Sequence, residues 1–138
     1  MVQTIRIELT DDIQDEVNKI SESSADSKVY VLFFGTELPS TGQSWCPDCY
    51  LAYPHIRNAF DECASNATLI EAPVGTREQW KNNPSHPYKV NQRIALRNIP
   101  TLIRWTVPAG KNDRLVESEC ENDELLKFFL TRDWRAQS

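Results

Sequence analysis

Two uninterrupted apolar runs constrain the fold of this chain more than any other feature of its sequence. Residues 28–35 read KVYVLFFG and residues 67–74 read ATLIEAPV. Neither run shows the regular alternation of apolar and polar residues that a half-exposed strand requires. Such runs are typical of strands that are covered on both faces, as in a sheet with helices on either side. The sequence therefore predicts a layered α/β fold with both runs as buried strands.

The N-terminal half supplies the elements that accompany these two strands. Residues 2–9 alternate apolar and polar side chains, which predicts a first strand. A helix with one apolar face follows, and the polar stretch at residues 21–27 ends it. A second helix is predicted from residue 47 to about residue 63, and Pro54 inside it is expected to kink it.

The C-terminal half begins irregularly and then returns to regular patterns. Residues 75–93 are rich in Asn and Pro, which predicts short helical turns and a surface loop. Residues 101–106 and 114–119 form two predicted strands, and the Pro-Ala-Gly turn at residues 107–113 joins them as a hairpin. Residues 121–134 carry an apolar face and acidic residues at their start, which predicts an amphipathic closing helix.

The predicted order is βαβαβ followed by ββα. The first part requires parallel strands with crossover helices, and the second part supplies an antiparallel pair. We therefore predict a central mixed β-sheet with helices on both faces. A length of 138 residues suits one domain over residues 1–138.

Charge and composition limit the classes of partner and the cell compartment that the sequence predicts. The net charge of −5 and the scattered basic residues argue against a nucleic-acid partner, because phosphate binding needs clustered Lys and Arg. No segment approaches the roughly 18 apolar residues of a membrane span, and residues 1–17 have no apolar core of signal-peptide length. We therefore expect a cytoplasmic protein with no nucleic-acid or membrane partner. In a reducing compartment, a set of four cysteines favours catalytic or metal-binding roles over structural disulfides.

The segment WCPDC at residues 45–49 carries the chemistry. Two thiols three positions apart can close a disulfide across one turn of chain and can pass two electrons to another disulfide. Cys46 precedes the second predicted helix, where N–H groups and the helix dipole favour a thiolate, so we expect it to be the nucleophile. Cys49 is expected to be the resolving thiol, more buried and with a higher pKa.

The two residues between the thiols are expected to affect the stiffness of the loop and the pKa of Cys46. Pro47 has no N–H to lose in the first helical turn and stiffens the loop. The carboxylate of Asp48 opposes thiolate formation and makes the mouth of the site acidic, although it also favours the helix N-terminus. We expect the pKa of Cys46 to lie below about 8.5 but above that of strong oxidants. A role for Asp48 as a simple helix cap stays open.

These motifs together resemble the thioredoxin fold. A strand precedes a CxxC that opens a helix, Pro54 falls five residues after the second cysteine, and Ile99-Pro100-Thr101 opens a later strand. Within that superfamily, SWCPDC at residues 44–49 and LVESEC at residues 115–120 are similar to the cytosolic thioredoxin domain-containing protein 17 family. Tyr50 departs from the smaller residue expected after the second cysteine.

The resemblance implies a protein-disulfide reductase that acts on small-molecule disulfides such as cystine, or on selected protein disulfides. It implies thioredoxin reductase and NADPH as the electron source, and a redox-active Cys46–Cys49 disulfide with no bound cofactor or metal. Pro100 is expected to be cis, which leaves the backbone of Ile99 free to pair with substrate, and the Trp45 indole is expected to face substrate. We expect a monomer.

Other interpretations of the same residues remain open at this stage. Pro100 can be a trans proline that starts an edge strand, and Trp45 can belong to the core. The chain can be a thioredoxin-fold interaction module with little turnover. A zinc site on CPDC needs two more ligands, and the remaining Cys and His residues are poorly spaced for it.

The sequence also gives predictions for the other two cysteines, the two histidines and the proton acceptor of Cys49. Cys63 and Cys120 are expected to be structural or incidental, although a disulfide between them stays possible. His55 and His86 are expected on the solvated surface. The strand predicted over residues 28–35 has no carboxylate to accept the proton of Cys49, which leaves water, Glu37, Asp48 or another group.

Overall fold

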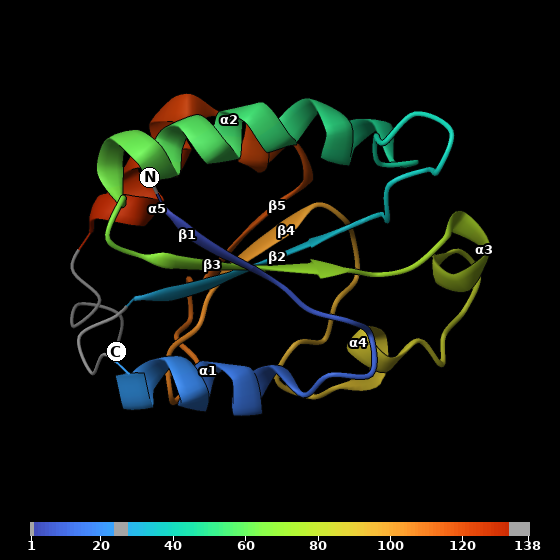
Figure 1. Ribbon diagram of the computed structural model, residues 1–138, viewed down its shortest axis with the longest axis horizontal. Helices are drawn as coiled ribbons and strands as arrows, with labels where there is room; N and C mark the ends of the chain where they lie inside the picture. Colours follow the sequence, from blue (N-terminus) through green and yellow to red (C-terminus); the bar gives the residue numbers. More distant parts are fainter. Residues whose placement is uncertain (1, 24–27, 133–138) are drawn as a thin grey trace.

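The computed structural model describes residues 2–23 and 28–132, which form a five-stranded sheet with helices on both faces (Figure 1). The strands are β1 (Gln3–Arg6), β2 (Val29–Phe34), β3 (Thr68–Pro73), β4 (Thr101–Arg104) and β5 (Arg114–Val116). Their order across the sheet is β1-β3-β2-β4-β5. Strands β1, β3 and β2 run parallel, whereas β2, β4 and β5 are antiparallel neighbours. The predicted mixed sheet is confirmed.

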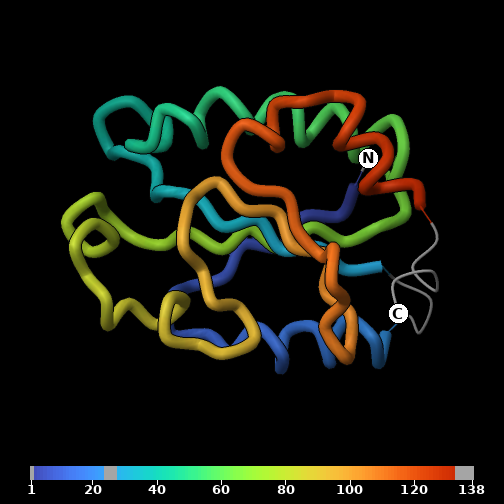
Figure 2. The backbone as a smooth tube through the Cα atoms, turned by 180° about the vertical axis from the view of Figure 1, so that it is seen from behind, coloured from blue at the N-terminus to red at the C-terminus, as the bar shows by residue number. Residues whose placement is uncertain are grey.

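The helices divide between the two faces of this sheet. They are α1 (Ile13–Ser23), α2 (Pro47–Cys63), α3 (Arg77–Trp80), α4 (Pro87–Val90) and α5 (Asp123–Thr131), with a 3-10 helix, η1 (Glu117–Glu121), before α5. Helices α2 and α5 cover one face, and α1 and α4 cover the other, as both views show (Figures 1 and 2). Within residues 2–23 and 28–132, no helix is long and apolar enough to cross a membrane.

The two apolar runs are the central strands of the sheet. Every residue of β2 and β3 is buried. Side chains alternate faces along a strand, so Tyr30 and Phe33 point in opposite directions. Tyr30 packs edge-on against Phe60 of α2 at a centroid distance of 5.0 Å, whereas Phe33 packs against Tyr88 of α4 at 5.0 Å. Both faces of β2 therefore need apolar side chains, which is why its sequence does not alternate.

The strand predicted over residues 101–106 ends at Arg104, and the first and last strands also end earlier than predicted because the chain turns locally. The first strand stops at Arg6, since the N–H of Glu8 donates to the Asp11 carboxylate at 2.8 Å and starts a turn. The last strand stops at Val116, because Glu117 has a φ of 50° and begins the 3-10 helix.

The closing helix also begins later than residue 121. Asn122 caps α5 by accepting the N–H of Leu125 at 3.1 Å, so the helix begins at Asp123. The end of the predicted helix at residues 133–134 lies outside the described residues. Helix α2 runs from Pro47 to Cys63 with Pro54 inside it, and the kink at Pro54 stays a prediction.

His86 is not a surface residue, so that prediction was wrong. Its side chain is buried, with Nε2 2.7 Å from the carbonyl oxygen of Val74 and Nδ1 accepting the N–H of Tyr88 at 3.1 Å. These partners fit a neutral ring that donates from Nε2. Burial lowers the pKa of His86 accordingly. The imidazole therefore ties α4 to the end of β3.

Candidate active site

Cys46 stands at the N-terminus of α2, in the N-cap position. Its backbone is extended, with φ −89° and ψ 112°, and Pro47 occupies the first turn, where no N–H is needed. The Sγ of Cys46 accepts the backbone N–H of Cys49 at 3.3 Å. A sulfur therefore takes the place of the oxygen that usually caps a helix, and it receives a donor that favours negative charge.

These surroundings lower the pKa of Cys46 to about 7. The largest cause is the hydrogen bond from the Cys49 side chain, and the N–H groups of Cys49 and Asp48 act in the same direction. Burial and the charge of Asp48 oppose them. The direction agrees with the sequence-based expectation, in which helix start and carboxylate partly offset each other.

The pKa of Cys49 is shifted in the opposite direction, although both side chains are buried and only one helical turn separates them. Its side chain is buried, and its pKa is raised, first by the hydrogen bond to Cys46 and then by burial. The backbone of Gly35 and the hydroxyl of Ser44 reduce that shift without cancelling it. Near neutral pH the pair therefore combines a reactive thiolate with a protonated partner. Both are free thiols in this structure.

Ser44 is a polar contact of the dithiol that sequence reasoning did not single out. Its hydroxyl donates to the carbonyl oxygen of Gly35 at 2.6 Å and accepts the N–H of Cys46 at 3.2 Å. Its single hydrogen can turn from the Gly35 carbonyl to the Cys49 sulfur, which is the direction that lowers the pKa of Cys49. The signal was present in the motif, since serine directly precedes WCPDC.

Trp45 packs against the protein on the other side of Cys46. Its Nε1–H donates to the carbonyl oxygen of Gly75 at 2.8 Å, and the indole is only partly buried. The ring lies so close to Gly35 that an added Cβ would come within 2.6 Å of it, so Gly35 is required there. The protein fixes the indole, and contact between its accessible part and substrate stays a prediction.

The Ile99-Pro100 segment faces the dithiol, and its peptide bond is cis as expected. The carbonyl oxygen of Ile99 lies 4.0 Å from the Sγ of Cys46. Cys120 packs behind this segment, with its Sγ 3.5 Å from the carbonyl oxygen of Leu115 and its side chain fully buried. Burial raises the pKa of Cys120 to about 12, which fits an unreactive core thiol.

Asp48 is exposed and borders a shallow acidic cleft. It lines a space of about 310 Å³ together with the segment from Val116 to Glu119, in which Glu117 and Glu119 add two more carboxylates. Carboxylates therefore gather beside the nucleophile, as the sequence suggested for Asp48 alone.

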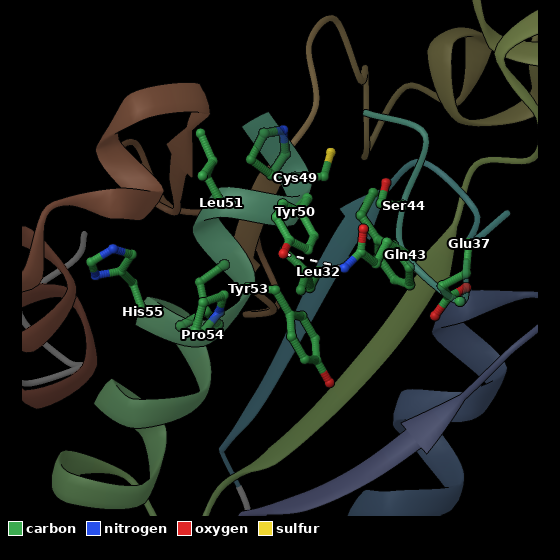
Figure 3. A pocket seen from close by; sticks show the side chains of 14 residues that line it. Leu32, Glu37, Gln43, Ser44, Cys49, Tyr50, Leu51, Tyr53, Pro54 and His55 are labelled. Atoms are coloured by element: carbon green, nitrogen blue, oxygen red, sulfur yellow. Dashed lines mark hydrogen bonds between the residues drawn. The ribbon is translucent and has the colours of Figure 1, made fainter. Parts of the chain in front are cut away.

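A larger cavity of about 560 Å³ lies beside Cys49 (Figure 3). Helix α2 contributes Tyr50 and Tyr53 to its wall, and the segment before the motif contributes Gln43. The amide of Gln43 donates to the hydroxyl of Tyr50 at 3.2 Å, which joins the two walls (dashed line in Figure 3). Sequence reasoning did not foresee this cavity, and the departure at Tyr50 was its only signal.

The sequence offered no carboxylate on β2, but a buried carboxylate lies on the neighbouring strand, β3. Glu71 of β3 is in register with Leu32 and accepts the hydroxyl of Tyr53 at 2.7 Å and the guanidinium of Arg6 at 3.1 Å. Arg6 also pairs with Glu37 at 2.7 Å, which lowers the pKa of Glu37. Burial, followed by Glu71, raises the pKa of Tyr53 to about 12.

Within residues 2–23 and 28–132, no group of three or more Cys, His, Asp or Glu side chains is placed to hold a metal ion. Cys63 is half-buried and free, and His55 lies on the surface beside Asp123, with Nδ1 2.9 Å from a carboxylate oxygen.

Comparisons with known proteins agree with this geometry. A family model described as "Thioredoxin domain-containing protein 17-like, thioredoxin domain" matches residues 8–132. The chain is 42% identical over 86 residues to the thioredoxin-like protein Clot of Arabidopsis thaliana, covering 62% of this chain and 63% of that protein. It is 32% identical over 101 residues to thioredoxin domain-containing protein 17 of Epinephelus coioides, covering 73% and 76%. The mouse protein of that name is 29% identical over 119 residues, covering 86% and 90%.

Proposed function

This chain belongs to the thioredoxin domain-containing protein 17-like thioredoxin family, and we propose that it is a dithiol–disulfide oxidoreductase that uses Cys46 and Cys49. Membership supports a thioredoxin-type redox role. The proposal adds the substrates, which are small-molecule disulfides such as cystine or selected protein disulfides. It also adds the electron source, which is NADPH through thioredoxin reductase.

The observation that carries the proposal is the asymmetry of the two sulfurs. Cys46 accepts the Cys49 N–H at 3.3 Å and has a pKa lowered to about 7, whereas the pKa of the buried Cys49 is raised. Thiol–disulfide exchange needs a nucleophile that is partly thiolate near neutral pH. It also needs a second thiol that stays protonated until the mixed disulfide has formed.

The reaction then proceeds in two exchange steps. The Cys46 thiolate attacks one sulfur of the substrate disulfide; that S–S bond breaks, and the departing thiolate takes up a proton. The Cys49 thiol loses its proton and attacks the Sγ of Cys46, which releases the second substrate thiol. The substrate gains two electrons and two protons, and the protein is left with a Cys46–Cys49 disulfide.

Residues around the sulfurs serve these steps. Pro47 holds the helix start that caps the Cys46 sulfur. The Ile99 carbonyl oxygen lies 4.0 Å from that sulfur, and we propose that it accepts a backbone N–H of an extended substrate. We assign Trp45 to substrate contact and Asp48 to the choice of substrate by charge.

Regeneration requires a two-electron donor, and we propose thioredoxin reductase, with NADPH converted to NADP⁺ in each cycle. This chemistry suits the cytoplasm, where thiols are kept reduced. We propose that the protein works as a monomer and binds no cofactor beyond its own dithiol.

The test couples cystine reduction to NADPH consumption in the presence of thioredoxin reductase. Wild type should turn over, and Cys46→Ser should reduce the rate to background because no thiolate remains at the helix start. Cys49→Ser should accumulate a mixed disulfide on Cys46, detected by mass spectrometry as an added half-cystine.

A matched control is Cys63→Ser, which removes a half-buried thiol far from the motif in sequence and should leave the rate unchanged. Turnover by Cys46→Ser equal to that of wild type would contradict the proposal. Absence of turnover with any disulfide and any reductase would favour the interaction module instead.

A further inference from the structure

The cavity beside Cys49 has the resolving thiol in its wall. Cys49 and Pro100 both line it, and the backbone N–H of Cys49 lies 3.3 Å from the nucleophilic Sγ of Cys46, which does not itself line the cavity. A disulfide that reacts with Cys46 therefore lies close to this cavity. Since an extended chain advances about 3.3 to 3.6 Å per residue, a side chain next to the attacked cysteine can reach it.

Aromatic and aliphatic side chains form most of this cavity. Leu32, Phe34 and Ile56 line it from the sheet and the helix. Tyr50 and Tyr53 line it as well, and their rings are drawn in Figure 3. Tyr50 and Tyr53 are 47% and 39% exposed, although large apolar side chains are usually covered. Exposed apolar side chains gathered around one concave site are typical of a binding surface.

The polar groups of the cavity already have partners within the protein. Glu37 is paired with Arg6, and the Tyr53 hydroxyl donates to Glu71. Gln43 and Tyr50 bond to each other. A charged ligand would have to break these contacts, whereas an apolar one needs only the space and the ring faces.

We propose that this cavity is a substrate subsite that receives a large apolar or aromatic side chain flanking the attacked cysteine of a peptide or protein disulfide. The proposal rests on the disulfide reductase function proposed above and adds the class of substrate. The presence of Cys49 in the wall fixes the occupant, because the substrate is the molecule that must approach the dithiol. Tyr50 is its principal contact, since this side chain is exposed and lies next to Cys49 in sequence.

Two synthetic disulfides test the proposal. Each is the symmetric dimer of an N-acetylated tetrapeptide amide, Gly-Cys-Phe-Gly in one case and Gly-Cys-Gly-Gly in the other. Pre-reduced protein is mixed with each disulfide, and the release of the free peptide thiol is followed by chromatography, without any recycling enzyme. The quantity compared is the ratio of the two second-order rate constants.

Wild type should reduce the phenylalanine peptide about tenfold faster, equivalent to about 1.4 kcal/mol of transition-state stabilisation, which partial burial of one aromatic ring can supply. Tyr50→Ala should lower the ratio to about threefold or less, and Tyr50→Phe should restore it because the ring remains. Phe128→Ala is the matched control, since Phe128 is an aromatic residue on α5 that is also exposed and does not line the cavity.

The outcomes separate the subsite from the function. Equal rate constants for the two peptides with wild type would overturn the subsite and leave the reductase function standing. The same loss of preference in Phe128→Ala as in Tyr50→Ala would also overturn it. If neither peptide is reduced, the proposed function falls and the subsite falls with it.

Discussion

The two ends of the first turn of α2 place chemically identical thiols in contrasting surroundings. At the helix start, Cys46 receives the N–H of Cys49, and its pKa falls to about 7. One turn later, Cys49 is buried against the sheet, and its pKa is raised. The hydrogen bond between the two side chains is the first cause of both shifts, since it lowers the pKa of Cys46 and raises that of Cys49. The cap position adds backbone N–H donors to Cys46, and burial adds to the shift of Cys49. The following predictions test how far that contrast extends.

The largest expected effect is the difference in alkylation rate between the two thiols. Only the thiolate reacts, so at pH 7 Cys46 should be alkylated by iodoacetamide on the order of 100-fold faster than Cys49. Peptide mapping of the reduced protein over time measures both rates in one sample. Similar rates at the two cysteines would remove the asymmetry on which the proposed function depends.

The pH dependence of the Cys46 reaction makes the contrast quantitative. Raising the pH converts thiol to thiolate, so the rate should rise with pH and level off above the pKa of about 7. Between pH 6 and pH 8 this gives a rise of about tenfold, compared with about a hundredfold for a thiol with a pKa near 9. A profile still rising steeply above pH 8 would show that the helix start does not lower the pKa of Cys46.

The sequence was sufficient to predict the sheet and the dithiol because both depend on local patterns. Residues 28–35 and 67–74 could be identified as buried strands, since most positions are apolar and the exceptions are Lys28, Thr68 and Glu71. Helix start and thiol spacing within residues 45–49 are likewise local. Such features need no knowledge of distant partners.

Features that depend on distant partners were missed. Glu71 lies within an apolar run, and its burial is made possible by Arg6, 65 residues away in sequence. His86 was expected on the surface, but its ring nitrogens find backbone partners at Val74 and Tyr88. A buried polar side chain is tolerated where it is hydrogen-bonded, and only the tertiary structure shows that bonding.

Ser44→Ala tests whether the hydroxyl between the two sulfurs supports the resolving step. Removing it takes away the acceptor for the Cys46 N–H and a donor to the Cys49 thiolate, so the pKa of Cys49 should rise further. We expect release of the second substrate thiol to slow about fivefold, or about 1 kcal/mol. Stopped-flow measurement of mixed-disulfide decay at several pH values checks this.

The control for that experiment is Ser40→Ala, an exposed serine on the same loop, which should leave the decay rate unchanged. Equal decay rates in Ser44→Ala and wild type across the pH range would show that Ser44 has no part in the resolving step. Its role would then be the hydrogen bond to the Gly35 carbonyl. A pure packing defect would lower stability without shifting the pH profile of the decay.

Removing the charge of Asp48 should change the difference between the two thiols least. The Asp48 carboxylate raises the pKa of Cys46, whereas the N–H groups at the helix start lower it. Asp48→Asn should lower the pKa of Cys46 by a few tenths of a unit, since the carboxylate raises it. The loss of charge should also favour anionic disulfides over neutral ones by about threefold at low salt, with the effect shrinking as salt screens the site. Thiolate absorbance and rates on glutathione disulfide and a neutral disulfide measure the two effects.

Glu22→Gln is the matched charge control, because Glu22 is exposed on α1, which covers the opposite face of the sheet from α2. If Asp48→Asn changes the ratio between anionic and neutral disulfides and Glu22→Gln does not, the acidic cleft selects substrates by local charge rather than by net charge. Since Glu117 and Glu119 line the same cleft and remain in place, the selection should weaken without reversing. If the ratio of rates on anionic and neutral disulfides is unchanged in Asp48→Asn, the carboxylate does not select substrates and only stabilises the helix N-terminus. Substrate choice would then depend on the apolar cavity beside Cys49.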